Sequence, residues 1–270
     1  MGFFDLFKAR INSPVNHENE HDIVISDGTH IVSACKNVLL TGRAVVVEAK
    51  DSSFSAVTGK SKLQIVENCE IFEVSRKAKI ALVKSGVLCV IKDYAEITTI
   101  NDAKIDYLTG WAKIGTMNNG SVKFIDQDAD LDTLNSGTVG FLRDRAMIGT
   151  VVQGNITGLF NSSRITTFNT GNIQYIFNNA VVGTMNSGIV SEMADFAEIT
   201  TQNSGSVDLM MGNSVICSQI SGVVREIAGS ALILYEQSKT KAAKVASLAE
   251  AVIKQEIPEI TIKKNGKKKK

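Results

Sequence analysis

Small residues recur every 17 positions along most of this chain. The series contains no large side chain and consists of Cys35, Ser52, Cys69, Gly86, Ala103, Gly120, Gly137, Gly154, Gly171, Gly188, Gly205 and Gly222. Cutting the chain two residues before each member gives twelve blocks of 17 residues, without a gap, from Ser33 to Glu236. Such a repeat is typical of a solenoid, in which each block forms one rung stacked on its neighbours.

The aligned blocks contain three apolar columns. Position 14 is Val, Leu or Ile in every block, position 8 is apolar in every block, and position 5 is apolar in all but the first, which has Asn37. Parallel rungs place each position on its own copy about every 4.8 Å, so we expect these columns to face the interior. The sequence predicts an all-β fold, a single-stranded parallel β-solenoid (β-helix) of twelve 17-residue rungs, roughly 57 Å long. The uneven inward spacing favours a right-handed winding.

Small and amide side chains form further columns. Position 12 is Ala nine times and Ser three times, so positions 3 and 12 are predicted to be tight corners, where glycine permits a positive φ. Position 1 predicts a ladder of side-chain amides that bond from rung to rung, formed by Asn101, Asn118, Asn135, Asn169, Asn186 and Asn203.

The flanks of the repeat complete a five-part organisation. We expect an amphipathic segment over 1–15, an irregular N-terminal cap over 16–32, the β-solenoid over 33–236, a C-terminal capping helix over 237–257 and a basic tail over 258–270. The helix could instead dock on a partner. His17, His21 and His30 lie among acidic residues of the cap, which we interpret as a polar linker rather than a metal cluster.

Composition argues against several function classes. Lys plus Arg number 29 and Asp plus Glu 28, whereas a nucleic-acid binder is usually far more basic. Four cysteines in 270 residues are too few for a disulfide scaffold, which favours reduced thiols and a cytoplasmic location. They form no C-x-x-C pair, so we expect no metal site. The repeat contains no His, and Asp93, Asp144 and Asp195 would lie about 14 Å apart, too far for a carboxylate pair. We therefore expect no enzyme activity and no cofactor.

The two termini are candidates for contact with an anionic membrane surface. An apolar cluster beside basic residues at the N-terminus and a lysine-rich C-terminus would act as two weak anchors together. The candidates are Phe3, Phe4, Leu6, Phe7, Lys8, Lys267, Lys268, Lys269 and Lys270. The alternatives are that the phenylalanines pack on the end of the rod and that the tail is simply solvated.

Three sets of surface residues are candidates for binding. An aromatic strip at positions 7 and 9 would form an association surface, unless it is tucked inward or covered by the C-terminal helix: Tyr107, Phe124, Phe141, Phe160, Tyr175 and Phe177. Position 16 stacks seven threonines, from Thr99 to Thr201, and then Ser218. This Thr column resembles ice-binding arrays but is also explained by a ladder within the stack. Arg43, Lys60, Lys62, Arg76, Lys77 and Lys79 form a local basic patch, for which a solvated face is the simpler interpretation.

The rung pattern G-x-[VI]-x-x-[LI]-x-x-x-A-x-[IV] resembles the bactofilin family. The segments AMIGTVVQGNITG (146–158) and AEITTQNSGSVDL (197–209) carry the resemblance, which covers 33–236. It implies a right-handed β-helical core in a polymer-forming, often membrane-associated bacterial cytoskeletal protein that uses no nucleotide. This chain departs from the family in its larger number of rungs and in its predicted cap, which would block end-to-end stacking.

These features together favour a non-catalytic structural rod that self-associates, as a homo-oligomer or filament, or scaffolds a protein partner at a membrane surface. One alternative is a solenoid that binds a glycan, ice or a protein with one regular face. Another is a viral or appendage structural protein.

Overall fold

A computed structural model describes residues 14–236, and this part of the chain is built from parallel β-strands. The strands are β1 (Val15–Glu18), β2 (Val24–Ile25), β3 (Thr29–Ser33), β4 (Val38–Leu40), β5 (Val45–Lys50), β6 (Ser53–Val57), β7 (Lys62–Glu67), β8 (Cys69–Val74), β9 (Lys79–Ile91), β10 (Glu96–Leu108), β11 (Lys113–Ile125), β12 (Asp130–Leu134), β13 (Thr138–Leu142), β14 (Met147–Leu159), β15 (Arg164–Ile176), β16 (Val181–Met185), β17 (Ile189–Met193), β18 (Glu198–Gln202), β19 (Ser206–Met210), β20 (Val215–Gln219), β21 (Val223–Ile227) and β22 (Leu232–Ile233).

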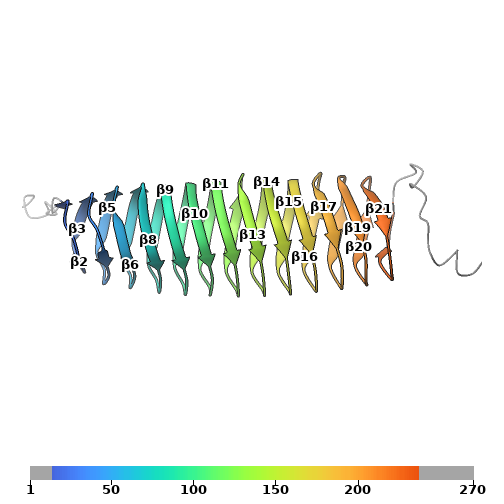
Figure 1. Ribbon diagram of the computed structural model, residues 1–270, viewed down its shortest axis with the longest axis horizontal. Coiled ribbons are helices and arrows are strands. Elements are labelled where there is room, and N and C mark those ends of the chain that lie inside the picture. The colour runs from blue at the N-terminus through green and yellow to red at the C-terminus, as the bar shows by residue number, and fades with distance from the viewer. Residues whose placement is uncertain (1–13, 237–270) are drawn as a thin grey trace, which may run out of the picture.

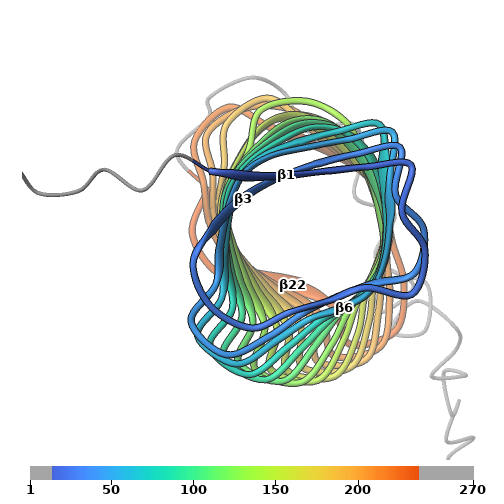
Figure 2. The same cartoon turned by 90° about the vertical axis from the view of Figure 1, so that its left-hand side faces the viewer.

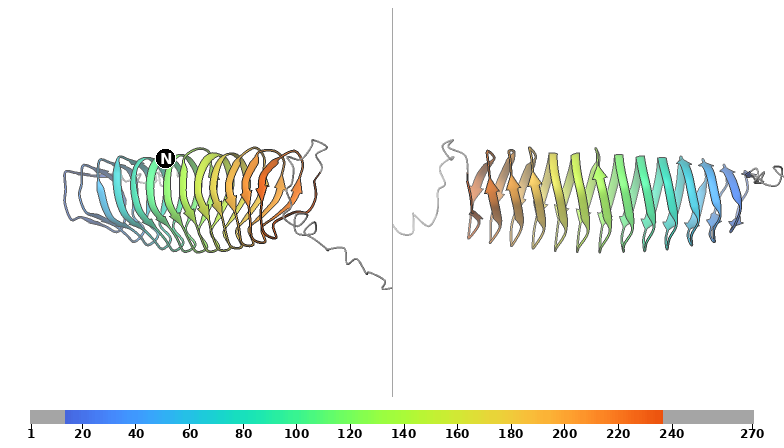
Figure 3. Two further views of the ribbon diagram at one scale, coloured as in Figure 1. Left: turned by 45° about the vertical axis from the view of Figure 1, so that its right-hand side comes forward. Right: turned by 180° about the vertical axis from the view of Figure 1, so that it is seen from behind.

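The strands stack into a straight rod, and the chain advances along it from one end to the other (Figures 1 and 3). From β5 onward, paired residues are 17 positions apart, as Ile97 is from Ile114 and Ile148 from Ile165. Seen from its N-terminal end, the chain winds clockwise as it recedes from the viewer, so the solenoid is right-handed (Figure 2). The predicted β-solenoid and its 17-residue rung are confirmed.

The interior of the rod is one continuous apolar core. The three predicted inward columns at positions 5, 8 and 14 are buried along the rod, as at Ile71, Leu108 and Ile148. A fourth inward column, at position 17, was not predicted, and its apolar members are Ala49, Val66, Val83, Ile100, Met117, Leu134, Val151, Phe168 and Met185. The buried positions on each side of the rung are three residues apart, with two exposed or half-buried residues between them, as in β18.

Left-handed backbone occurs at a corner that the sequence analysis did not single out. Position 10 has a φ between about 59° and 77° in every block, at Gly42, Gly59, Arg76, Asp93, Gly110, Gln127, Asp144, Asn161, Asn178, Asp195, Gly212 and Gly229. The prediction of positive φ at position 3 holds only for Gly86, Gly120, Gly137, Gly171 and Gly205. Position 12 is a tight interior point, as expected, and its Ala and Ser residues are buried.

The glycines of position 3 serve two purposes. Gly171 has a φ of +122°, and a Cβ atom there would overlap the backbone carbonyl of Gly154. Gly188 has no positive φ, but a Cβ atom there would overlap the ring of Phe168, which belongs to the buried position 17. One glycine is therefore required by backbone conformation and the other by the volume of a core side chain.

The predicted amide ladder is present in two runs. Asn118 donates from Nδ2 to Oδ1 of Asn101 at 2.9 Å, and Asn135 donates to Asn118 at 2.7 Å. Asn186 donates to Asn169, and Asn203 to Asn186, each at 2.6 Å. Val152 occupies the same position between the two runs, so the ladder is interrupted there.

Residues 15–33 add a shorter turn before the first block. Val15 of β1 pairs with His30 of β3, an offset of 15 residues rather than 17. The register also shifts between Val38 and Leu39, so Val38 pairs with Phe54 and takes the inward place. Asn37, the exception among the apolar residues of position 5, has a φ of 56° and is exposed. The predicted capping helix over 237–257 lies outside the described residues.

We predict that Gly171→Ala destabilises the rod much more than Gly154→Ala. The first substitution combines a positive φ with overlap onto backbone and should cost at least about 2 kcal/mol of unfolding free energy. The Cβ of the second would meet mainly the side chains of Leu134 and Val151, at 3.0 and 3.3 Å, for a cost of about 1 kcal/mol. Chemical denaturation measures both, and equal losses would contradict the assignment.

The amide ladder predicts which of two asparagines contributes more to the stability of the rod. Asn186→Ala removes two side-chain hydrogen bonds, to Asn169 and from Asn203, whereas Asn135→Ala removes one, to Asn118. At about 1 kcal/mol for each bond, the loss of stability should be about twice as large for Asn186→Ala. Thermal unfolding followed by circular dichroism tests this, and a larger effect at Asn135 would refute it.

Candidate functional site

The six predicted association residues lie in one continuous strip of aromatic rings, called here the aromatic strip. Ring centroids follow one another at 5.1 Å between Tyr107 and Phe124, 5.6 Å between Phe124 and Phe141, and 5.9 Å between Phe141 and Phe160. The last part continues from Phe160 to Phe177 at 5.8 Å, with Tyr175 beside Phe177 at 5.4 Å. The strip therefore spans five rungs, or about 19 Å of the rod.

The aromatic strip is continuous because, in one rung, a ring at position 9 takes the place of the missing ring at position 7. Position 7 carries an aromatic residue in four of these five rungs, but the eighth block has Gly158 there. Phe160, two residues later, lies over Gly158, where a Cβ atom would overlap its ring. The ring of Phe160 thus fills the gap between Phe141 and the aromatic residues of the next rung.

The aromatic strip is accessible from outside. Tyr107 is 40% exposed and Tyr175 is 38% exposed, while the four phenylalanines are half-buried. The strip therefore lies on the outer surface of the rod, with its phenylalanine rings partly sheltered by their stacking partners. Half-exposed rings in a row offer a larger apolar patch than isolated side chains do.

One cation lies against the aromatic strip, and a neighbouring carboxylate neutralises its charge. The Arg143 guanidinium lies 4.5 Å from the centroid of the Phe124 ring, a cation–π contact. The same guanidinium donates two hydrogen bonds to Asp126, at 2.7 and 2.6 Å, and this partner raises the pKa of Arg143. The arginine therefore covers part of the strip without leaving an uncompensated charge beside it.

The Thr column is stacked in register but not joined by hydroxyl-to-hydroxyl hydrogen bonds in the described part of the chain. Thr99 pairs with Thr116, and Thr133 with Thr150, and the column is half-buried. The bonded ladder of the rod is instead formed by the asparagines of position 1. The threonines therefore offer only a partly accessible face.

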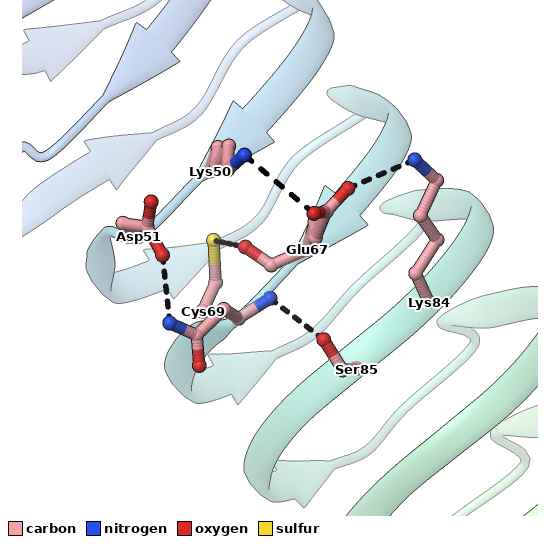
Figure 4. Close-up of polar contacts among 7 residues, drawn as sticks. Lys50, Asp51, Glu67, Cys69, Lys84 and Ser85 are labelled. Atoms are coloured by element: carbon pink, nitrogen blue, oxygen red, sulfur yellow. Dashed lines mark hydrogen bonds and ion pairs between the residues drawn. The ribbon is translucent and has the colours of Figure 1, made fainter.

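Ion pairs join side chains of neighbouring rungs on the charged surface. Figure 4 shows Glu67 between two lysines of neighbouring rungs, with Lys84 Nζ 2.8 Å from Oε2 and Lys50 Nζ 3.7 Å from Oε1. The hydrogen bond from Lys84 lowers the pKa of Glu67, and the same bond raises the pKa of Lys84. Both groups therefore remain charged at neutral pH.

The carboxylates at position 10 accept hydrogen bonds from residues in the turns of neighbouring rungs. Asp93 accepts a hydrogen bond from the backbone N–H of Arg76 at 3.1 Å, and Asp195 accepts one from Asn178 at 3.1 Å. Asp144 accepts a bond from the side chain of Asn161 at 2.9 Å. Each carboxylate thus ties its turn to the turn of a neighbouring rung, the preceding one for Asp93 and Asp195 and the following one for Asp144.

The histidines of the N-terminal turn bond with one another. His17 Nδ1 lies 3.0 Å from Glu20 Oε2, its Nε2 lies 3.1 Å from His30 Nδ1, and the two rings are stacked. His21 takes part instead in a parallel bridge with Lys36. Among the residues that the structure describes, no group of three or more His, Cys, Asp or Glu could hold a metal ion.

The four cysteines are free, and Cys35 and Cys69 are buried. The Cys69 thiol lies 3.3 Å from the backbone carbonyl oxygen of Glu67 (Figure 4), and burial raises its pKa. Burial, with nearby carboxylates, also raises the pKa values of Cys89 and Cys217. These last three thiols are therefore protonated and weakly nucleophilic at neutral pH.

A second exposed aromatic pair was not recognised from the sequence. Tyr94 and Trp111 stack at 5.2 Å with an interplanar angle of 16°, and they follow Lys77 at position 11 of successive blocks. The signal was present in the aligned blocks, where position 11 reads Arg43, Lys60, Lys77, Tyr94 and Trp111.

The membrane-contact candidates Phe3, Phe4, Leu6, Phe7, Lys8, Lys267, Lys268, Lys269 and Lys270 lie outside the described residues. Over residues 14–236, no helix is long and apolar enough to cross a membrane. No protein-family model, curated protein or solved structure matches the chain. Function must therefore be argued from the geometry of the rod itself.

The thiol environments predict slow alkylation of the native protein. In iodoacetamide at neutral pH, Cys35 and Cys69 should remain unmodified until the rod unfolds, because they are buried. Cys89 and Cys217 should react well below the rate of a denatured control, since their raised pKa values keep the thiolate scarce. Mass spectrometry of time points gives the site-specific rates. Rapid native labelling of Cys69 would contradict the described packing.

Proposed function

We propose that the chain is a non-catalytic structural rod that associates with copies of itself along the aromatic strip and is held at a membrane surface by its termini. The observation that carries this proposal is the continuity of six partly exposed rings over five rungs. The β-solenoid fold is consistent with a structural role.

A second copy of the chain is the partner that best matches the strip. The rings recur at the rung spacing of about 4.8 Å, and another solenoid of the same kind carries rings at that spacing. Two copies related by a two-fold axis would present the same strip to each other, so the exposed ring edges of one strip could pack against those of the other. Such a contact pairs rods side by side and leaves their ends unused.

Several features support the non-catalytic part of the proposal. The carboxylates at position 10 are engaged in hydrogen bonds to the turns of neighbouring rungs. Three of the four thiols have raised pKa values, which disfavours nucleophilic chemistry at neutral pH. The resemblance to bactofilins points in the same direction, because that family forms polymers. The predicted capping helix favours lateral over end-to-end association in this chain.

We predict that Tyr107→Asp with Tyr175→Asp weakens self-association at least about tenfold, because each interface would gain four buried or opposed carboxylates. Both positions are exposed, so the fold should tolerate the changes. Sedimentation velocity over a concentration series gives the dissociation constant. The matched control is Phe196→Asp, an exposed aromatic position outside the strip.

Negative-stain microscopy of the full chain, with and without anionic liposomes, tests the wider proposal. Paired rods, sheets or membrane-bound arrays are expected. Isolated rods about 6 nm long that ignore liposomes would overturn it. A strictly trimeric rod would favour the appendage alternative instead.

A further inference from the structure

One corner of the rod carries an unusual set of side chains, called here the basic corner. It lies at positions 10, 11 and 13 of the first five blocks and consists of Arg43, Lys60, Lys62, Arg76, Lys77, Lys79, Tyr94 and Trp111. Backbone hydrogen bonds tie its turns together, from Lys60 N–H to Gly42 and from Lys77 N–H to Gly59. The eight side chains are all exposed.

The cations of the basic corner are mostly unpaired. Lys79 pairs with Glu96 at 2.5 Å, but within residues 14–236 the other five make no ion pair. Most cations of residues 14–236 outside the corner are compensated across rungs, as Arg143 is by Asp126 and Arg145 by Asp128. Stacked like charges destabilise a sheet, so their retention on three successive rungs points to an external anionic partner.

Two protruding aromatic rings continue the row of cations. Tyr94 is 54% exposed and Trp111 is 59% exposed, although each could bury a large apolar area. A shallow pocket of about 380 Å³ lies beside them, lined by Arg76, Lys77, Asp93, Gly110 and Gln127 as well as by the two rings. Asp93 is the one acidic group of that pocket, and it already accepts a bond from the backbone of Arg76.

We propose that the basic corner binds the surface of an anionic bilayer and lays the rod flat on it. Lys and Arg are attracted to anionic headgroups, and Trp and Tyr partition to the level of those headgroups. The corner runs along the rod axis, so its cations and rings reach one plane together over about 19 Å. This inference rests on the proposed membrane association and adds an orientation to it.

The stacking of the rings favours a bilayer over a soluble polyanion. Nucleic-acid bases bind to proteins by stacking on open aromatic faces. Tyr94 and Trp111 belong to successive rungs and stack on each other, so their faces are directed along the rod and their edges project outward. Projecting edges suit insertion among headgroups better than they suit stacking of a base.

Trp111 provides a direct probe, because it is the only tryptophan in the chain. The full chain is mixed with vesicles of phosphatidylserine and phosphatidylcholine, and with vesicles of phosphatidylcholine alone. Tryptophan fluorescence should shift to the blue, and brominated lipids should quench it, with the anionic vesicles only. Added salt should reverse the shift, since the attraction is electrostatic.

The matched variants test the cations. Lys60→Gln with Lys77→Gln should weaken binding to anionic vesicles about 30-fold, which corresponds to about 1 kcal/mol for each lysine. Lys36→Gln with Lys104→Gln removes the same charge from two exposed lysines at position 4 that make no ion pair within residues 14–236, and should change binding only a few-fold. Equal losses in both variants would overturn the inference.

The remaining outcomes separate this inference from the proposed function. If vesicles bind the chain without any response of Trp111, the corner is not the contact, while membrane association through the termini stands. If no vesicles bind, both fail. If Trp111 responds to a sulfated polysaccharide or single-stranded DNA but not to vesicles, the partner is a soluble polyanion and the inference is overturned.

Discussion

In-register stacking of 17-residue rungs is the constraint from which the rest of this structure follows. Backbone hydrogen bonds between parallel strands hold each residue against its own counterpart in the next rung, as with Ile97 and Ile114. Each side chain therefore contacts the side chain at the same position of the next rung. A residue type can repeat down a column only if two copies of it can lie in contact. Aliphatic side chains, amides and aromatic rings meet this condition.

Charged side chains repel copies of themselves in the next rung, and the rod pairs many of them with the opposite charge instead. Arg143 over Asp126 and Lys84 over Glu67 alternate sign between successive rungs of one column. The amide of asparagine solves the same problem without charge, because it donates to one neighbour and accepts from the other. Against this background the basic corner differs because its unpaired cations are stacked on three successive rungs, and their retention makes that corner a candidate for binding.

Large side chains in one column of the core are matched by glycines in another column, which leave the space that they occupy. Phe168 fits because Gly188 leaves room for its ring, and Gly222 leaves room for the side chain of Gln202 in the same way. Gln202 and Gln219 are buried at position 17, where earlier rungs have apolar residues, and Oε1 of Gln202 makes no hydrogen bond. The core therefore becomes more polar toward the C-terminal end of the described residues.

The sequence by itself determined the 17-residue period and three of the four inward columns, because a repeated column has a single environment and its composition reports that environment. It predicted twelve rungs, and the shorter turn before the first block adds one more that does not share the period. It did not reveal position 17, whose apolar run ends at Gln202 and whose three-residue spacing from position 14 is not that of a flat strand. The left-handed corner at position 10 was also missed, although ten of its twelve residues are Gly, Asn or Asp, the types that most readily adopt a positive φ. Only the tertiary structure shows that position 10 turns in every rung and that position 17 faces the core, since both follow from closing the rung. The same closure brought Phe160 over Gly158 and Tyr94 onto Trp111, and so completed surfaces that the separate columns only suggest.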